Sequence, residues 1–303
     1  LSIQMQDLIQ CVNKFNPKII MVLGDREEAI NAALVGNYLN KIVVHIGGGD
    51  RVIGNIDDQI RHAITSISHI HFTFSKNSYD RLVRMGEQKF RIFNIGHPGI
   101  DRLKNTKKLN LKYVFNKLNI KFSIKDKYVI CLQHPLSSEY KQSYNQMRIT
   151  LESLKELKIN SIVIYPNSDA GSKDIIKVFN NYKEIDNFTF KKNVPRELFV
   201  NLLKHCSCLI GNSSLGILES PFLKIPVINI GNRQKGRYHS NNVFFVNHNK
   251  SQIKKNILSL TSRNYKKNNI INPFGNGNSS KLIIKLLNKI KYDSKLFKKD
   301  LTY

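Results

Sequence analysis

The sequence lacks an apolar run that could span a membrane. A transmembrane helix needs about 20 consecutive apolar residues, and the apolar runs of this 303-residue chain are much shorter. The first residues also lack the basic segment and apolar stretch of a secretory signal peptide. We therefore expect no membrane partner. Because the chain does not begin with methionine, we expect it to be a fragment of a longer protein.

Cysteine is scarce, and the spacing of the cysteines excludes a small domain stabilised by a bound metal or by a set of disulfides. The four cysteines match neither a metal site nor a disulfide framework. Cys131, Cys206 and Cys208 lie in apolar, strand-like runs, which predicts buried thiols in a reducing compartment. We therefore expect a cytoplasmic protein. No group of His, Cys and Asp has metal-ligand spacing, so we expect no metal.

Acidic residues are few. The chain has 22 Asp and Glu against 48 Lys and Arg, a formal net charge of +26. Such a charge can indicate nucleic-acid binding, but the lysines are scattered among Asn and Ile. Neither zinc-finger spacing nor an aromatic RNA-binding signature accompanies them. We expect no nucleic-acid partner, and the charge instead favours attraction of a small anionic substrate.

Two common catalytic signatures are also missing. The glycine fingerprint G-x-G-x-x-G of NAD-binding proteins does not occur, and no Ser-His-Asp nucleophile elbow is present. We therefore expect no bound cofactor.

Apolar runs and helix-like segments alternate along the chain, and the apolar fraction of 41% is enough for two domain cores. The first run, residues 18–23, is continuous and predicts a buried parallel strand. A Lys/Asn-rich stretch places a domain boundary near residue 120. The sequence thus predicts an α/β fold with two Rossmann-like domains, residues 1–120 and 121–303. Further strands are expected at residues 41–46, 71–74, 91–95, 128–132, 161–165, 187–190, 208–210 and 225–230.

The turn at residues 211–219 organises the second half. It joins two expected strands through a helix and carries Ser213 and Ser214, whose hydroxyl and N–H groups suit phosphate oxygens at a helix N-terminus. The next loop, residues 231–237, adds cations such as Arg233. We interpret the two segments as a diphosphate cradle at the carboxyl edge of a parallel sheet. The alternative is an ordinary helix cap beside an exposed basic turn.

Other polar side chains also follow expected strands, where ligands bind in open α/β sheets. They are Asp25 and Arg26, the Gly47–Asp50 turn, His134, and the pair Asn167 and Asp169. Two domains facing each other would place such residues around a cleft. Asp57 and Arg61 lie four residues apart and share a helix face, so an ion pair that merely stabilises the helix is the alternative there. His45, inside an apolar strand, is expected to be a packed core residue.

Together these motifs resemble the hydrolysing UDP-N-acetylglucosamine 2-epimerases, a family that releases UDP and yields N-acetylmannosamine for sialic acid synthesis. The matching segments run in order along nearly the whole chain, at residues 24–26, 47–50, 56–65, 133–135, 166–172, 211–219, 229–237 and 242–243. The resemblance implies two Rossmann-like domains in the GT-B arrangement, with the nucleotide sugar in the interdomain cleft. We also expect a homo-oligomer, either a dimer or a tetramer.

The implied reaction removes the proton at C2 of the sugar, breaks the C1–O bond to the diphosphate, and adds water to the resulting glycal. Proton transfer needs a carboxylate or imidazole near the ring, and the candidates are Asp25, Asp57 and His134. Positive groups and hydrogen-bond donors must stabilise the departing diphosphate. Arg61, His134, Ser213 and Ser214 fit this role, with Arg26 or Arg233 nearby.

The resemblance assigns further residues to substrate binding. Glu219 would bind the ribose hydroxyls, Asn167 and Asp169 would position the substrate, and Asn242 lies in a matching segment at the nucleotide. The chain departs from the family in two places. The first βα segment of the family, with its basic residue, is not matched, and the sialic acid enzymes commonly carry Glu or His where this chain has Gly47.

Several substrates and functions stay open from the sequence. The sugar could be UDP-N-acetylglucosamine or a diacetamido sugar of a legionaminic acid pathway, and the nucleotide could be UDP or GDP. The non-hydrolysing 2-epimerase is a neighbouring alternative. A GT-B glycosyltransferase and a nucleotide-sugar-binding protein without turnover are the others.

Overall fold

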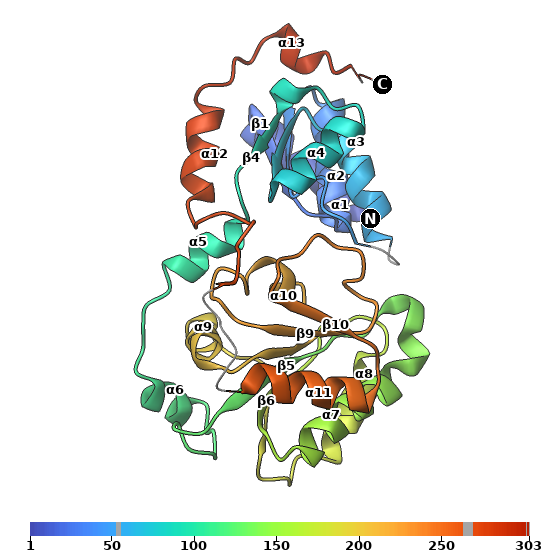
Figure 1. Cartoon of the computed structure of the whole chain (residues 1–303). Helices are drawn as coiled ribbons and strands as arrows, with labels where there is room; N and C mark the ends of the chain where they lie inside the picture. Colours follow the sequence, from blue (N-terminus) through green and yellow to red (C-terminus); the bar gives the residue numbers. More distant parts are fainter. Residues whose placement is uncertain (53–55, 263–268, 301, 303) are drawn as a thin grey trace. The chain divides into compact units, whose positions relative to one another are not determined.

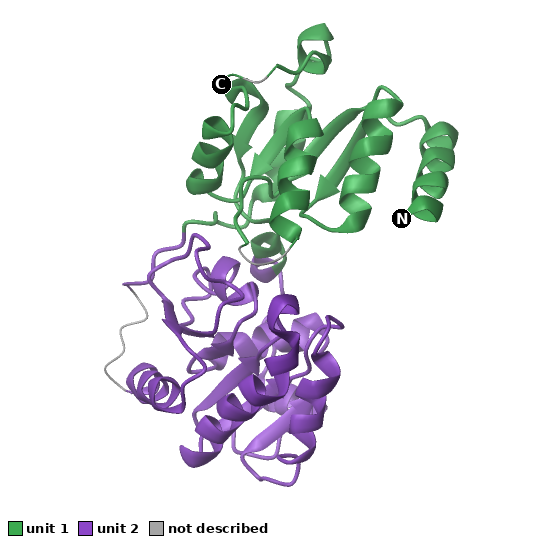
Figure 2. Cartoon of the chain, turned by 90° about the vertical axis from the view of Figure 1, so that its right-hand side faces the viewer, with its two compact units in different colours: residues 1–52, 56–102, 273–303 green, residues 53–55, 103–272 purple. Residues whose placement is uncertain are grey.

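The computed structural model describes residues 1–52, 56–262, 269–300 and 302. The chain divides into two compact units (Figure 2). Unit 1 comprises residues 1–52, 56–102 and 273–303, and unit 2 comprises mainly residues 103–272. Within the described residues, no helix is both long and apolar enough to cross a lipid bilayer.

Unit 1 is built on a four-stranded parallel sheet in the order β1-β2-β3-β4 (Figure 1). Each strand is followed by a helix, as expected when parallel strands are joined by crossovers. The strands are β1 (Ile19–Leu23), β2 (Ile42–Ile46), β3 (Ile70–Thr73) and β4 (Ile92–Asn94). The helices are α1 (Ser2–Phe15), α2 (Glu27–Tyr38), α3 (Asp57–Ile67), α4 (Lys76–Arg84), the short 3₁₀ helix η1 (Lys89–Arg91) and α5 (Pro98–Lys104).

The expectation that the first strand is buried was wrong: only Val22 of its five residues is buried, and Met21 and Leu23 are exposed. Val22 is 4% exposed and packs against α2, but Met21 is 45% exposed and Leu23 62%. The reason is position: among the described strands β1 pairs only with β2, so it forms an edge of the sheet. A continuous apolar run predicts a strand but does not tell which of its two faces is covered.

Unit 2 contains a six-stranded parallel sheet in the order β10-β9-β8-β5-β6-β7. The strand order reverses direction between β5 and β8, which is where open α/β sheets bind ligands. The strands are β5 (Tyr128–Leu132), β6 (Asn160–Ile164), β7 (Phe188–Lys191), β8 (Leu209–Gly211), β9 (Val227–Ile230) and β10 (Val243–Val246). The helices are α6 (Leu111–Lys117), η2 (Ser137–Gln142), α7 (Ser143–Glu156), α8 (Ser172–Asn180), α9 (Arg196–His205), α10 (Leu215–Leu218) and α11 (Lys250–Thr261).

The two parallel sheets, each joined by helices, confirm the predicted α/β class with two Rossmann-like domains. The strand β10 was not expected from the sequence. Cys131, Cys206 and Cys208 are buried as predicted, and burial raises the pKa of the Cys131 thiol to about 12.

The last residues of the chain belong to unit 1, whereas the sequence placed them in the second domain. They form α12 (Ser279–Leu287) and α13 (Ser294–Phe297). The fully buried Arg91 holds this segment by donating hydrogen bonds to the carbonyl oxygens of residues 295, 296 and 298. The carboxylate of Asp101 accepts from the backbone N–H groups at the start of α12. Contacts between residues about 180–200 positions apart leave no local sequence pattern, so the unit boundaries differ from the expected ones.

Candidate functional site

In unit 2, the ends of β5 and β8 are locked together by Asn212. Its Oδ1 accepts a hydrogen bond from the backbone N–H of His134 (2.7 Å), and its Nδ2 donates to the carbonyl oxygen of the same residue (2.9 Å). Gly211 allows this close approach, since a Cβ there would lie 2.2 Å from the carbonyl oxygen of Leu132. Asn212 was not among the predicted site residues, although its place between a strand and the serine pair was a usable signal.

The His134 imidazole is held in one tautomer. The backbone N–H of Asn167 donates to His134 Nδ1 over 3.0 Å, so we assign the proton of the neutral ring to Nε2. Burial, and secondly the positive charge of Arg233, lower the pKa of His134 to about 4, and the negative charge of Asp169 only partly opposes this shift. The ring is therefore neutral at pH 7 and offers a single N–H donor.

The loop after β9 contacts the serine turn. Arg233 Nη1 and Gln234 Nε2 both donate to the carbonyl oxygen of Asn212, each at 3.1 Å. The structure thus brings Arg233 and His134 to the same strand ends as Ser213 and Ser214. The helix α10 that follows has only four residues, so its dipole adds less than the sequence led us to expect. A phosphate group here would rely on hydroxyls, backbone N–H groups and Arg233.

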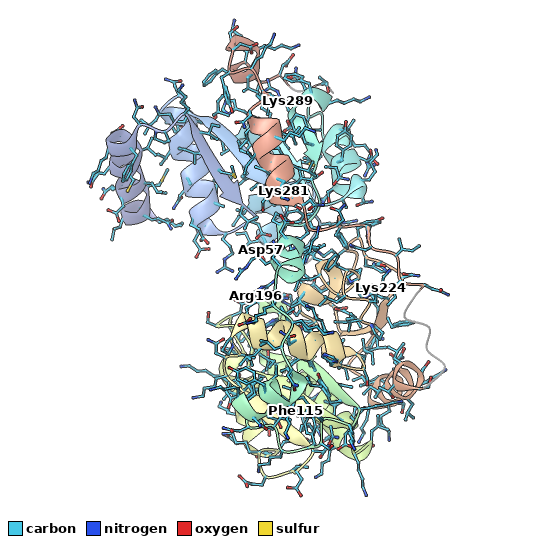
Figure 3. All side chains as sticks on the ribbon, turned by 90° about the vertical axis from the view of Figure 1, so that its left-hand side faces the viewer. Asp57, Phe115, Arg196, Lys224, Lys281 and Lys289 are labelled. Atoms are coloured by element: carbon cyan, nitrogen blue, oxygen red, sulfur yellow. The ribbon has the colours of Figure 1, made fainter. Side chains whose placement is uncertain are left out.

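The other predicted substrate residues of unit 2 have defined partners. Glu219 accepts a hydrogen bond from Arg196 at 3.1 Å, and its side chain is 14% exposed. Glu219 therefore does not simply face solvent. Arg196, which is labelled in Figure 3, is the first residue of α9. The Asn167 amide donates to the Asp169 carboxylate, so each side chain orients the other.

Asn242 lies in the core of unit 2. Its side chain is fully buried, and its Nδ2 donates to Ser220 Oγ and to the carbonyl oxygen of Ile225. The structure gives this amide a packing role, so we do not carry Asn242 forward as a nucleotide contact.

In unit 1, Arg61 reaches back from α3 to the ends of two strands. Its Nη2 forms an ion pair with Asp25, and its Nη1 donates to the carbonyl oxygen of Gly47 at 2.7 Å. The side chains of Arg61 and Asp25 are 6% and 16% exposed, respectively. The proposed helix-face pair with Asp57 is not formed, because the guanidinium is already engaged. Arg26 is more exposed and lies near Glu27.

Asp57 is the first residue of α3 and is half-buried (Figure 3). In the part of the chain that the structure describes, its carboxylate has no hydrogen bond or ion pair. Its neighbour Asp58 is instead tied to Arg81 and His62. Of the two predicted carboxylates of unit 1, Asp57 is therefore accessible for proton transfer, whereas Asp25 is committed to Arg61.

His45 is a core residue, as expected. It is fully buried, with Nε2 2.8 Å from the carbonyl oxygen of Gly24 and Nδ1 3.2 Å from Thr65 Oγ1. Burial lowers its pKa to about 3. Within the residues described, no three side chains among His, Cys, Asp and Glu are grouped as metal ligands.

Gly47 lies under an aromatic ring. It has φ +90°, and a Cβ there would lie 2.8 Å from Cζ of Phe74. That ring is 5% exposed and packs edge-on against His97. Phe74 thus fills the space where a side chain at position 47 would begin.

We expect Gly47→Ala to lower the free energy of unfolding by about 2–4 kcal/mol, because it combines positive-φ strain with a steric clash. Gly24→Ala is the matched control, since Gly24 has φ +79° but open space around its missing Cβ. It should cost only the strain, about 1 kcal/mol. Urea unfolding measures both, and equal losses would show that Phe74 does not restrict position 47.

Comparisons with known proteins agree with these motifs. A family model described as UDP-N-acetylglucosamine 2-epimerase matches residues 1–288. A UDP-N,N'-diacetylbacillosamine 2-epimerase (hydrolyzing) of Legionella pneumophila is 32% identical over 283 residues, 93% of this chain and 74% of that protein. A GDP/UDP-N,N'-diacetylbacillosamine 2-epimerase (hydrolyzing) of Campylobacter jejuni is 34% identical over 255 residues, 83% of this chain and 65% of that protein.

The fold has a close counterpart among solved structures. The crystal structure of UDP-GlcNAc 2-epimerase from Neisseria meningitidis bound to UDP-GlcNAc matches with a TM-score of 0.81 at 20% sequence identity. The match covers 95% of this chain and 80% of that one. The resemblance inferred from the motifs is thus confirmed, and this chain belongs to the UDP-N-acetylglucosamine 2-epimerase family.

Proposed function

We propose that this protein is a hydrolysing 2-epimerase of a nucleotide-activated acetamido sugar. Its substrate would be UDP-N-acetylglucosamine or a related diacetamido sugar, and its products UDP and the free 2-epimeric sugar, N-acetylmannosamine in the first case. The names of the Legionella and Campylobacter relatives favour a diacetamido sugar and a hydrolysing reaction. The observation that carries the proposal is the neutral, oriented His134 beside the serine turn.

In the proposed first step, the carboxylate of Asp57 takes the proton from C2 of the sugar. The electron pair of that C–H bond forms the C1–C2 double bond, and the C1–O bond breaks towards the diphosphate, which leaves as UDP. His134 Nε2–H, Arg233 and the hydroxyls of Ser213 and Ser214 stabilise the charge that develops on the phosphate oxygens.

In the second step, water adds to the glycal. Hydroxyl attaches to C1, and a proton is delivered to C2 on the opposite face, which inverts that centre. In unit 1, the Asp25–Arg61 pair holds the carbonyl group of Gly47 and fixes the base of α3 from which Asp57 projects. Glu219, Asn167 and Asp169 remain proposed contacts of the ribose and the sugar.

The test is incubation in heavy water with UDP-N-acetylglucosamine and, separately, with the UDP- and GDP-linked diacetamido sugars. We expect UDP or GDP and the free 2-epimer in equal amounts, with one deuterium at C2. Retention of the nucleotide on the epimerised sugar would indicate a non-hydrolysing epimerase. Transfer of sugar without label at C2 would indicate a glycosyltransferase, and binding without any turnover would indicate a binding protein.

A further inference from the structure

A pocket lies in unit 2 at the carboxyl ends of β9 and β10, on the other side of the loop after β9 from the serine turn. It has a volume of about 240 Å³, and its walls come from the loop after β9, the end of β10 and the first turn of α11. The lining residues are Gly231, Asn232, Lys235, Gly236, His239, Phe245, Val246, Asn247 and Gln252. None of them is a residue that we assign to the proposed reaction.

The loop after β9 separates this pocket from the serine turn. Arg233 and Gln234 face the turn, where both donate to the carbonyl oxygen of Asn212. Their neighbours Asn232 and Lys235 line the pocket instead. One short loop therefore presents cationic groups in two directions, and only one of them is used by the proposed diphosphate site.

The pocket lining combines one cation, several amides and an aromatic wall. Lys235 supplies the charge, and the lining residues include no Asp or Glu. In the described part of the chain, the one carboxylate bonded to a lining residue is that of Glu139, which is engaged by Asn232 Nδ2 at 2.9 Å. Gln252 Oε1 accepts from the backbone N–H of Asn247 at 3.1 Å, which leaves the NH₂ group of this amide as a donor. Phe245 is 38% exposed and packs edge-on against His239, with ring centroids 5.0 Å apart. Amides suit hydroxyl groups, and an exposed aromatic face suits the apolar face of a sugar ring.

We propose that this pocket binds a monosaccharide-sized polyol that carries one anionic group, either a carboxylate or a phosphate. The volume lies below the roughly 300–1,000 Å³ of sites for drug-sized ligands, so a single sugar ring fits better than a nucleotide sugar. Lys235 pairs with the anion, the amides of Asn247 and Gln252 bind hydroxyls, and the net charge of +26 raises the local concentration of anions.

Binding of three probes, measured by titration calorimetry and ligand-observed NMR, tests the proposal. N-acetylneuraminate carries a carboxylate, glucose 6-phosphate carries a phosphate, and N-acetylglucosamine is neutral. We expect at least one anionic probe to bind and the neutral sugar to bind much more weakly. The anionic probe that binds identifies which of the two anions the pocket prefers.

Two variants and one control test whether the probe binds in this pocket. Lys235→Gln should lower the affinity for the anionic probe about fivefold, as expected for the loss of a partly exposed ion pair. Lys155→Gln, an exposed lysine at the end of α7, is the control and should change nothing. Gln252→Glu should lower the affinity for the anionic probe more strongly, because the new carboxylate repels the anionic group of the probe. It should not harm the fold, because Glu is favoured three residues after the Asn249 helix cap.

Three results would overturn the proposal. The first is failure of both anionic probes to bind at millimolar concentration. The second is unchanged affinity in Gln252→Glu. The third is displacement of the probe by UDP, which would place the probe at the serine turn instead.

Discussion

Replacing Asp57 with asparagine is expected to lower the rate of UDP release by about 10²–10⁴-fold, the usual contribution of a general base. Deuterium incorporation at C2 should fall in parallel, because asparagine cannot accept the proton. UDP affinity should stay close to that of the wild type, since the residues proposed to hold the diphosphate are unchanged. Quenched-flow or coupled UDP assays in heavy water measure both rates.

The neighbour Asp58 provides the matched control. Side chains of successive helix residues point about 100° apart, and Asp58 is engaged with Arg81, His62 and the backbone N–H of Val52. Asp58→Asn should therefore retain most of the deuterium incorporation, although it weakens the packing around α3. Asp57→Asn should cost only about 0.3–1 kcal/mol of stability, the value of a carboxylate at a helix N-terminus. Full C2 exchange in Asp57→Asn would remove this residue from the mechanism.

The contrast between Asp57 and Asp25 shows where local sequence patterns stop being informative. The spacing of Asp57 and Arg61 suggested an ion pair on one helix face, which is worth a few tenths of a kcal/mol. The structure pairs Arg61 with Asp25 instead, 36 positions away in sequence. A buried guanidinium needs acceptors for its N–H groups, and the carbonyl oxygen of Gly47 and the carboxylate of Asp25 accept from Nη1 and Nη2 of Arg61, respectively.

Strand ends were predictable because their signal is local. Each of the motifs at residues 24–26, 133–135, 166–172 and 211–219 begins at the last residue of a strand or within two residues after it, as the apolar runs indicated. What the runs could not supply was the packing between distant segments. This packing determines three features that the sequence did not predict. They are the exposed face of β1, the anchoring of α12 and α13 by Arg91 and Asp101, and the burial of Asn242.

His134 also illustrates how structure changes a functional assignment. From the sequence it was a candidate both for proton transfer and for stabilising the leaving group. The hydrogen bond from the Asn167 N–H occupies Nδ1, and the pKa of about 4 keeps the ring neutral. A neutral imidazole with its proton on Nε2 is a fixed donor, so the structure favours the second role.

A pair of substitutions at His134 separates these roles. His134→Asn keeps an acceptor near the position of Nδ1 but has no donor at the position of Nε2. We therefore expect kcat to fall about 10²–10³-fold. His134→Gln places an amide N–H near the position of Nε2 and should recover a substantial part of that loss. If the ring acted as a charged acid, both variants would be equally impaired, because neither amide can release a proton.

The pH dependence of the wild type gives an independent check of the same assignment. The folded-state pKa of about 4 lies below the ordinary value of 6.5, so the unfolded chain binds this proton more readily than the folded one. Stability linked to His134 is therefore complete above pH 6.5 and is lost as the pH falls towards 4. Protonation also turns Nδ1 into a donor that opposes the Asn167 N–H. In the pH–rate profile, the acidic limb that reflects protonation of His134 should consequently lie near pH 4 and be absent in His134→Gln. An acidic limb near pH 6.5 in the wild type would contradict the assignment of His134 as a buried, neutral donor.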